Sequence, residues 1–152
     1  MAERLADMLE HEHRDIDRGI ETFMAGVGER DAEALRRAIA ALRRHIYVEE
    51  ERIFPALRDK SMFAPLLVML REHGQLWDRV DGIQQELAAG AAGAVRLCHQ
   101  LFVQLQHHNA KEERIIYAQA DAAFPREEAL ELVAFLRDGD LPDGWVCAKA
   151  TR

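Results

Sequence analysis

The sequence has little of what marks secreted, disulfide-linked or membrane proteins. Its 152 residues include only 2 cysteines, Cys98 and Cys147, which lie far apart and form no CxxC pair. The start, MAERLADMLEHEH, lacks the apolar segment of a signal peptide, and no apolar run reaches the length of a membrane span. These absences predict a chain that works in the reducing cytoplasm and does not contact a membrane.

Positive charge is also scarce, because 20 basic residues stand against 27 acidic ones and give a net charge of −7. No long basic patch is present, so nucleic-acid binding has little electrostatic support. A content of 49% hydrophobic and 31% charged residues is typical of a globular chain, and the length suits one ordinary core. We therefore expect a single domain over residues 1–152.

Helical periodicity dominates the sequence, and strand signals are weak. Asp31 is a candidate N-cap for the second helix, and Pro55 should kink or end that helix. Four long helices with short links favour an all-α, antiparallel up-down-up-down four-helix bundle over about residues 3–121. A short C-terminal helix and a tail without periodicity should occupy about residues 122–152. The predicted helices cover about residues 3–27, 31–58, 61–89, 94–121 and 127–136.

Two segments in the two halves of the chain repeat each other. In HIYVEEERIF, His45 is followed four residues later by Glu49, and in HNAKEERIIY His108 is followed in the same way by Glu112. A Glu-His pair, which ends in His13 or His73, precedes each segment. The chain therefore reads H-HxxxE-H-HxxxE, and its halves look like a duplicated helical hairpin.

Helical phase places these side chains inside the predicted bundle, because they fall on the same apolar faces as the core residues. The faces comprise positions 9-13-16-20-23, 38-42-45-49-53-56, 66-70-73-77-80 and 101-105-108-112-116. His11, His99 and His107 fall off these faces and should point to solvent. Buried carboxylates are costly unless cations accompany them, and imidazoles with carboxylates suit transition metals. The predicted metal ligands are His13, His45, Glu49, His73, His108 and Glu112.

Simpler explanations exist for single residues of this pattern. One buried histidine is more often a hydrogen-bonded core residue, and one HxxxE also describes an exposed ion pair. Four histidines and two glutamates in phase, placed by a repeat, favour the metal interpretation. Glu50 and Glu113 lie about 100° off the inward line, so they are equally compatible with surface groups and with outer groups around a metal. Phe54 and Tyr117 are most simply core aromatics, although Tyr117 could hydrogen-bond near the site.

The phrases EHRDID, HIYVEEERIFPAL, EHGQLW and HHNAKEERIIYAQA resemble the hemerythrin-like (HHE cation-binding) family over about residues 5–121. The resemblance implies a four-helix bundle that holds two iron ions joined by an oxo or hydroxo bridge. The family's oxygen carriers have a further histidine one turn after the third helix's ligand, where this chain has Trp77. The residues carried over are the histidine ligands His13, His45, His73 and His108 and the bridging carboxylates Glu49 and Glu112.

The substitution at Trp77 speaks against simple oxygen carriage. The H-HxxxE-H-HxxxE pattern resembles family members linked to iron-centre repair, nitric oxide or peroxide chemistry, and iron or oxygen sensing. The implied function is a di-iron protein that binds or reacts with oxygen, peroxide or nitric oxide. Two alternatives stay open: a sensor that acts through metal-linked folding and partner binding, and a catalase-like enzyme. Ferritin-like carboxylate centres, with ExxH spacing, and tetrahedral zinc sites fit the six predicted ligands less well.

Overall fold

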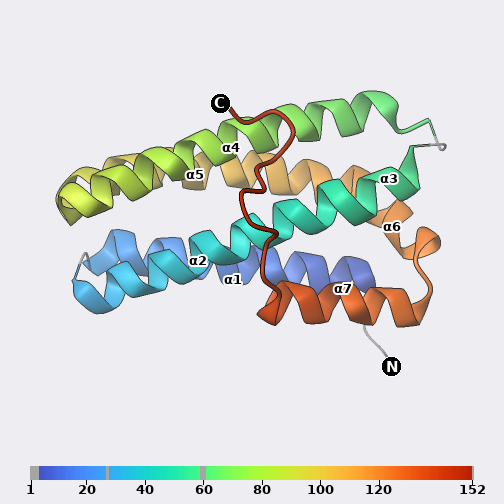
Figure 1. Cartoon of the computed structure of the whole chain (residues 1–152), viewed down its shortest axis with the longest axis horizontal. Helices are drawn as coiled ribbons and strands as arrows, with labels where there is room; N and C mark the ends of the chain where they lie inside the picture. The colour runs from blue at the N-terminus through green and yellow to red at the C-terminus, as the bar shows by residue number, and fades with distance from the viewer. Residues whose placement is uncertain (1–3, 27, 59–60, 152) are drawn as a thin grey trace.

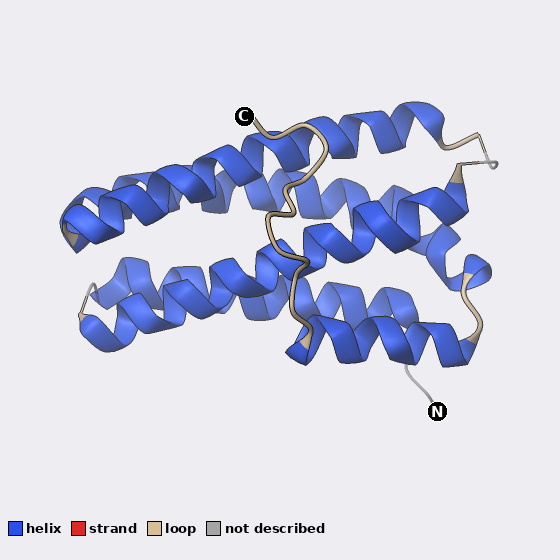
Figure 2. Ribbon diagram, viewed as in Figure 1, coloured by secondary structure: helices blue, strands red, loops and turns tan. Residues whose placement is uncertain are grey.

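The computed structural model describes residues 4–26, 28–58 and 61–151, and every regular element in those ranges is a helix (Figure 2). The all-α class is thereby confirmed, while the predicted helix ends at Glu3 and Val27 lie outside the described residues. None of the described helices is long and apolar enough to cross a membrane. The elements are α1 (Leu5–Gly26), α2 (Glu29–Val48), η1 (Glu49–Ile53), α3 (Phe54–Leu57), α4 (Phe63–Ala89), α5 (Ala91–Lys111), η2 (Glu112–Ile116), α6 (Tyr117–Ala123) and α7 (Arg126–Asp138).

The helices pack as two hairpins, α1 with α2 and α4 with α5 (Figure 1). Contacts between α1 and α5 and between α2 and α4 join the hairpins, and α7 lies against α1 and α2. The coil that follows α7, residues 139–151, crosses α2 and reaches α4. We call this coil the C-terminal strap. Its Trp145 ring lies 5.0 Å from Tyr47 on α2, and the Thr151 amide donates to Asp78 on α4 at 3.0 Å.

The apolar core is divided into two clusters, and a belt of buried polar residues separates them. The division is visible along α1, where Leu9 belongs to one cluster, Ile16 belongs to the other, and buried His13 lies between. The longest helix, α4, repeats this order, since His73 lies between Met69 and Leu76. The belt is therefore held from both ends by close-packed apolar side chains, which exclude water from it.

The start of α2 differs from the prediction. The helix begins at Glu29, and the Gly28 amide donates a hydrogen bond to the Asp31 carboxylate at 3.0 Å. Asp31 is therefore the third residue of the helix and not its N-cap. Its carboxylate still satisfies one of the amides that a helix start leaves without an intrahelical partner, so the chemistry that motivated the prediction is retained.

Each predicted HxxxE helix contains one turn of π-helix that begins at its glutamate. In η1 the Phe54 amide donates to the Glu49 carbonyl, a bond between residues five apart. The wider turn shifts the helical phase of everything that follows. Ala56, which was predicted on the inward face, is consequently exposed, while Phe54 and Leu57 are buried. Pro55, which has no amide hydrogen to donate, lies in the first turn of α3, directly after the π turn, and the helical stretch continues past it to Leu57.

Candidate metal centre

The six predicted ligands all lie in the polar belt, and each is at most 3% exposed. Their inward atoms form two groups that could each hold a cation, and the groups share both glutamates. We call His13 and His45 with the two glutamates the first half-site, and His73 and His108 with the same glutamates the second half-site. The burial expected from helical phase is thus confirmed, whereas metal ligation by these residues stays a prediction.

The two glutamates link the half-sites because each carboxylate presents one oxygen to each of them. Glu49 Oε2 lies 3.4 Å from His45 Nε2, and its Oε1 lies 3.2 Å from His73 Nε2. Glu112 Oε1 lies 3.2 Å from His13 Nε2, and its Oε2 lies 3.1 Å from His108 Nε2. This arrangement matches the way bridging carboxylates serve two neighbouring ions in helical-bundle metal centres.

The inward atoms of the second half-site lack hydrogen-bond partners. His73 Nε2, Glu49 Oε1 and Glu112 Oε2 are buried and make no hydrogen bond to any residue that the structure describes. A buried polar atom without a partner costs about 1–3 kcal/mol, and more when it is charged. These three atoms face one another, since His73 Nε2 lies 3.2 Å from Glu49 Oε1 and 3.5 Å from Glu112 Oε2, so either a protonated imidazole or a bound cation has to offset the charge of the two carboxylates. Imidazole nitrogens with carboxylate oxygens are a donor set that suits first-row transition metals.

In the first half-site the phenol of Tyr117 supplies the missing partners. Its oxygen donates to Glu49 Oε2 at 2.8 Å and lies 3.2 Å from Glu112 Oε1. The same oxygen lies 2.9 Å from Nε2 of His13 and 2.9 Å from Nε2 of His45. The hydroxyl group therefore touches one inward atom of each residue in this half-site.

Three of the four histidines are oriented by a further glutamate on their outer nitrogen. His73 Nδ1 pairs with Glu50 at 2.7 Å, His13 Nδ1 with Glu113 at 2.9 Å, and His108 Nδ1 with Glu72 at 2.8 Å. In metal centres such partners fix the ring and leave Nε2 free to bind the ion. Glu50 and Glu113 thus lie behind two histidines of the belt, where they would orient these rings if the belt holds metal. Buried His45 Nδ1 has no such partner among the described residues.

Sequence reasoning gave no role to Glu72 or to the C-terminal strap. Glu72 belongs to the repeated Glu-His pair, and that repeat was the available signal; it crosses from α4 to His108 on α5 and also pairs with Lys111. The strap reaches the second half-site, because the Ala148 amide donates to Glu50 Oε1 at 2.9 Å. A side chain at Gly74, next to His73, would collide with the backbone carbonyl of Lys149.

Trp77, the position where oxygen carriers have a histidine, anchors the strap. Its ring meets Trp145 edge-on at 5.4 Å, and the Arg43 guanidinium lies 4.4 Å from its centre. The Trp145 indole also donates to Glu51 at 3.0 Å. Indole at this position therefore contributes packing and a cation–π contact in place of a ligand.

The buried histidines and glutamates of the belt shift one another's pKa values. Burial alone would lower the pKa of His13, but its hydrogen bonds to Glu112 and Glu113 outweigh burial and raise the pKa to about 9. His73 behaves in the same way, with a pKa well above 6.5, because Glu112, Glu49 and Glu50 outweigh its burial. Burial would raise the pKa of Glu112, yet His108, His13 and His73 hold it well below 4.5. In the metal-free protein, protonated imidazoles thus provide the positive charge that the glutamates require.

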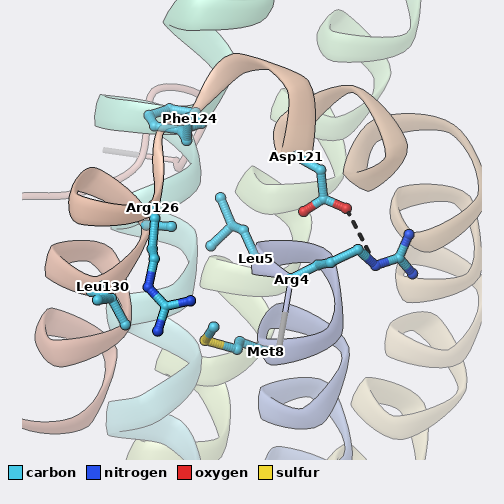
Figure 3. Close-up of a pocket in the computed structure, with 8 residues that line it drawn as sticks. Arg4, Leu5, Met8, Asp121, Phe124, Arg126 and Leu130 are labelled. Atoms are coloured by element: carbon cyan, nitrogen blue, oxygen red, sulfur yellow. Dashed lines mark ion pairs between the residues drawn. The ribbon is translucent and has the colours of Figure 1, made fainter. Parts of the chain in front are cut away.

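The remaining histidines and the surface pockets lie outside this centre. His11, His99 and His107 are exposed, as their helical phase predicted. A surface pocket of about 430 Å³ lies where α1 begins, between the end of α6 and α7 (Figure 3). Its lining includes Arg4, Asp121 and Arg126 and none of the six predicted ligands. It contains no histidine and therefore does not compete with the belt as a metal centre.

Comparison with known protein families agrees with this geometry. The family model described as the hemerythrin HHE cation binding domain matches residues 4–120. The matched range is most of the chain and includes all six predicted ligands and Tyr117, but not α7 or the strap. No curated protein and no solved structure matches the chain.

Proposed function

Since this chain belongs to the hemerythrin HHE cation-binding family, we propose that it is a non-haem protein that holds two iron ions in the buried belt. The observation that carries the proposal is the sharing of Glu49 and Glu112, each with one oxygen toward each half-site. A single ion would need only one of the two histidine pairs. Two pairs that share both carboxylates are the donor set for two ions.

The side chains would divide the work as follows. The four histidines would hold the ions, and the two glutamates, which both half-sites share, would offset part of their charge. The apolar clusters on both sides keep bulk water out. Bound iron would supply two accessible oxidation states and a position at which oxygen, peroxide or nitric oxide can bind.

Three structural expectations belong to the same proposal. The helices form an antiparallel up-down-up-down bundle, which fits the two packed hairpins with their short connections. Residues 1–152 form one domain, since α7 and the strap both pack on the bundle. The cytoplasm is the compartment, which the free thiols of buried Cys98 and Cys147 support.

Metal analysis of purified protein tests this proposal. After expression in iron-rich medium we expect about two irons per chain, as in other di-iron bundle proteins, and a charge-transfer absorption in the oxidised state. Oxygen, peroxide or nitric oxide should then change that absorption. Iron far below one per chain after reconstitution, without such absorption, would contradict the proposal.

A sensor function is a second candidate, and the unpartnered atoms of the second half-site favour it. If a cation satisfies these atoms, metal binding adds directly to folding stability. Removing the metal should then lower the melting temperature and loosen the helices. Equal stability and equal helicity with and without metal would exclude this mode of sensing.

A peroxide-decomposing enzyme would use the same second half-site. Its inward atoms contact no phenol, so a ligand from solution meets no internal competitor there. Turnover of hydrogen peroxide by the iron-loaded protein, lost in His73→Ala, is the expected result. A loaded protein that leaves peroxide unchanged would rule this activity out.

A further inference from the structure

Tyr117 and Phe54 hold equivalent places in the two halves of the chain. Each follows its bridging glutamate by five residues, and each donates its backbone amide to that glutamate's carbonyl across a π turn. The Tyr117 ring stacks on His13 at 5.4 Å, and the Phe54 ring stacks on His73 at 5.5 Å. The repeat is therefore preserved in backbone and ring position, and the residues at this place differ by one hydroxyl group.

The π turn brings that hydroxyl into the belt. In an uninterrupted α-helix, residues five apart point about 140° away from each other. The extra residue of η2 turns Tyr117 back to the side of Glu112, so that its hydroxyl lies 3.2 Å from Glu112 Oε1. Single π turns inside α-helices are frequent at functional sites. Here the π turn places a phenol oxygen among the candidate metal-binding atoms.

The distances around this oxygen are those between ligands of one ion. Four inward atoms surround it at 2.8 to 3.2 Å. The recognised donors are similarly spaced, with 3.2 Å between His13 and Glu112 and 3.4 Å between His45 and Glu49. Two donors bound at right angles to one ion, each about 2.1 Å from it, are about 3 Å apart. The phenol oxygen thus has the spacing of one more donor.

We propose that Tyr117 is a fifth protein ligand of the first half-site, which leaves the second half-site as the place where small molecules bind. The inference rests on the proposed function and specifies which half of the centre reacts. On metal binding the phenol O–H bond breaks, the proton leaves to water, and an oxygen lone pair binds the cation, with no change of oxidation state. The second half-site has no equivalent donor, because Phe54 carries no hydroxyl.

The first experiment uses the optical spectrum of the ferric protein. Tyrosinate bound to ferric iron should give a visible charge-transfer band. The chain has 2 tyrosines, so Tyr47→Phe is a matched control. Tyr47 packs against Phe135 and Trp145 and lies outside the belt. We expect the band in the wild type and in Tyr47→Phe, and its loss in Tyr117→Phe together with at least about a tenfold weaker affinity for one of the two irons.

A second measurement needs no substitution at the site. Resonance Raman spectra of wild-type protein should show phenolate vibrations. These vibrations should move to lower frequency when the protein is expressed with ring-deuterated tyrosine. Two irons per chain without such vibrations, or a visible band of unchanged position and intensity in Tyr117→Phe, would show that Tyr117 is not bound to iron in the loaded protein. That outcome overturns this inference alone, whereas failure to take up iron overturns the proposed function as well.

Discussion

The two half-sites are built from the same residue types at the same spacing, yet their surroundings differ. In the first, the inward atoms contact the Tyr117 hydroxyl, and Glu113 behind His13 makes no bond to the strap. In the second, three inward atoms make no hydrogen bond to a described residue, and Glu50 behind His73 is held by the Ala148 amide. The two halves of the repeat thus differ in two ways: one has a phenol among its inward atoms, whereas the other has none there and is contacted by the strap.

Removing a shared glutamate should have the largest effect, because it damages both half-sites at once. Glu112→Ala takes away one oxygen donor from each and leaves excess positive charge in a buried belt. We expect iron content to fall from about two per chain to nearly none. Exposed Glu131 on α7 provides the control, since Glu131→Ala should keep full iron content. Two irons retained in Glu112→Ala would mean that the half-sites do not share this residue.

Removing one histidine should affect metal binding at one half-site only. His13→Ala and His73→Ala should each lose about one of two irons, since each removes a donor from one group only. The iron that remains should differ between the two variants. If Tyr117 is a ligand of the first half-site, the tyrosinate band persists in His73→Ala, which keeps that half-site, and weakens in His13→Ala, which damages it. His11→Ala, which alters an exposed residue, should leave iron content and spectrum unchanged. Identical spectra in His13→Ala and His73→Ala would contradict the assignment of Tyr117 to the first half-site.

The metal-free protein should lose stability as pH rises, and the loaded protein should not. The pKa of His13 rises from 6.5 to about 9 on folding. Its protonated form therefore stabilises the folded state fully below pH 6.5, and that stabilisation disappears as pH approaches 9. The loss is about 3 kcal/mol, or roughly 10 °C in melting temperature.

His73 and His108, whose pKa values are also raised, act in the same direction. In the loaded protein the cation replaces these protons, so stability should not fall between pH 6.5 and 9. Thermal melts of chelator-treated and reconstituted protein across this range measure the difference. A metal-free protein that is equally stable at both ends of the range would contradict the proposed charge balance.

The outer glutamates should give the smallest effects, confined to one half-site each. Glu50→Gln should weaken the second half-site and Glu113→Gln the first, by about tenfold in metal affinity or roughly 1.4 kcal/mol. We expect the greater loss of metal affinity for Glu50→Gln, because the Glu50 side chain is 4% exposed and the Glu113 side chain is 34% exposed. Titration with iron, following the two binding steps separately, distinguishes them. Equal losses at both steps would indicate that the outer glutamates act on the whole belt.

The sequence was sufficient for the parts of the site that follow regular α-helical phase. His13 and His73 lie within uninterrupted α-helices, and His45 and His108 precede the π turns, so a period of 3.6 placed them correctly on the inside. After the glutamates the same period was only partly correct, because Ile53 and Ile116 are buried as expected, whereas Ala56 was expected inside and is exposed. A π turn adds one residue to the hydrogen-bonded turn of a helix, and no residue pattern in the sequence indicated it.

The sequence suggested that Tyr117 could hydrogen-bond near the site, but it did not predict the four partners of Tyr117 or the strap's bond to Glu50. The phase of Tyr117 depends on η2, so its four contacts could not be derived from α-helical spacing. The strap has no periodicity, and its bond to Glu50 joins residues 98 positions apart. Contacts of this kind follow from tertiary packing alone.

The strap also separates the cover of the second half-site from the ligands themselves. All six candidate ligands precede residues 145–148, because the last of them is Glu112. The cover that Ala148 and Trp145 provide therefore comes from a coil outside the helices that hold the ligands. A change in this coil can thus alter access to the second half-site while every ligand keeps its place on the bundle.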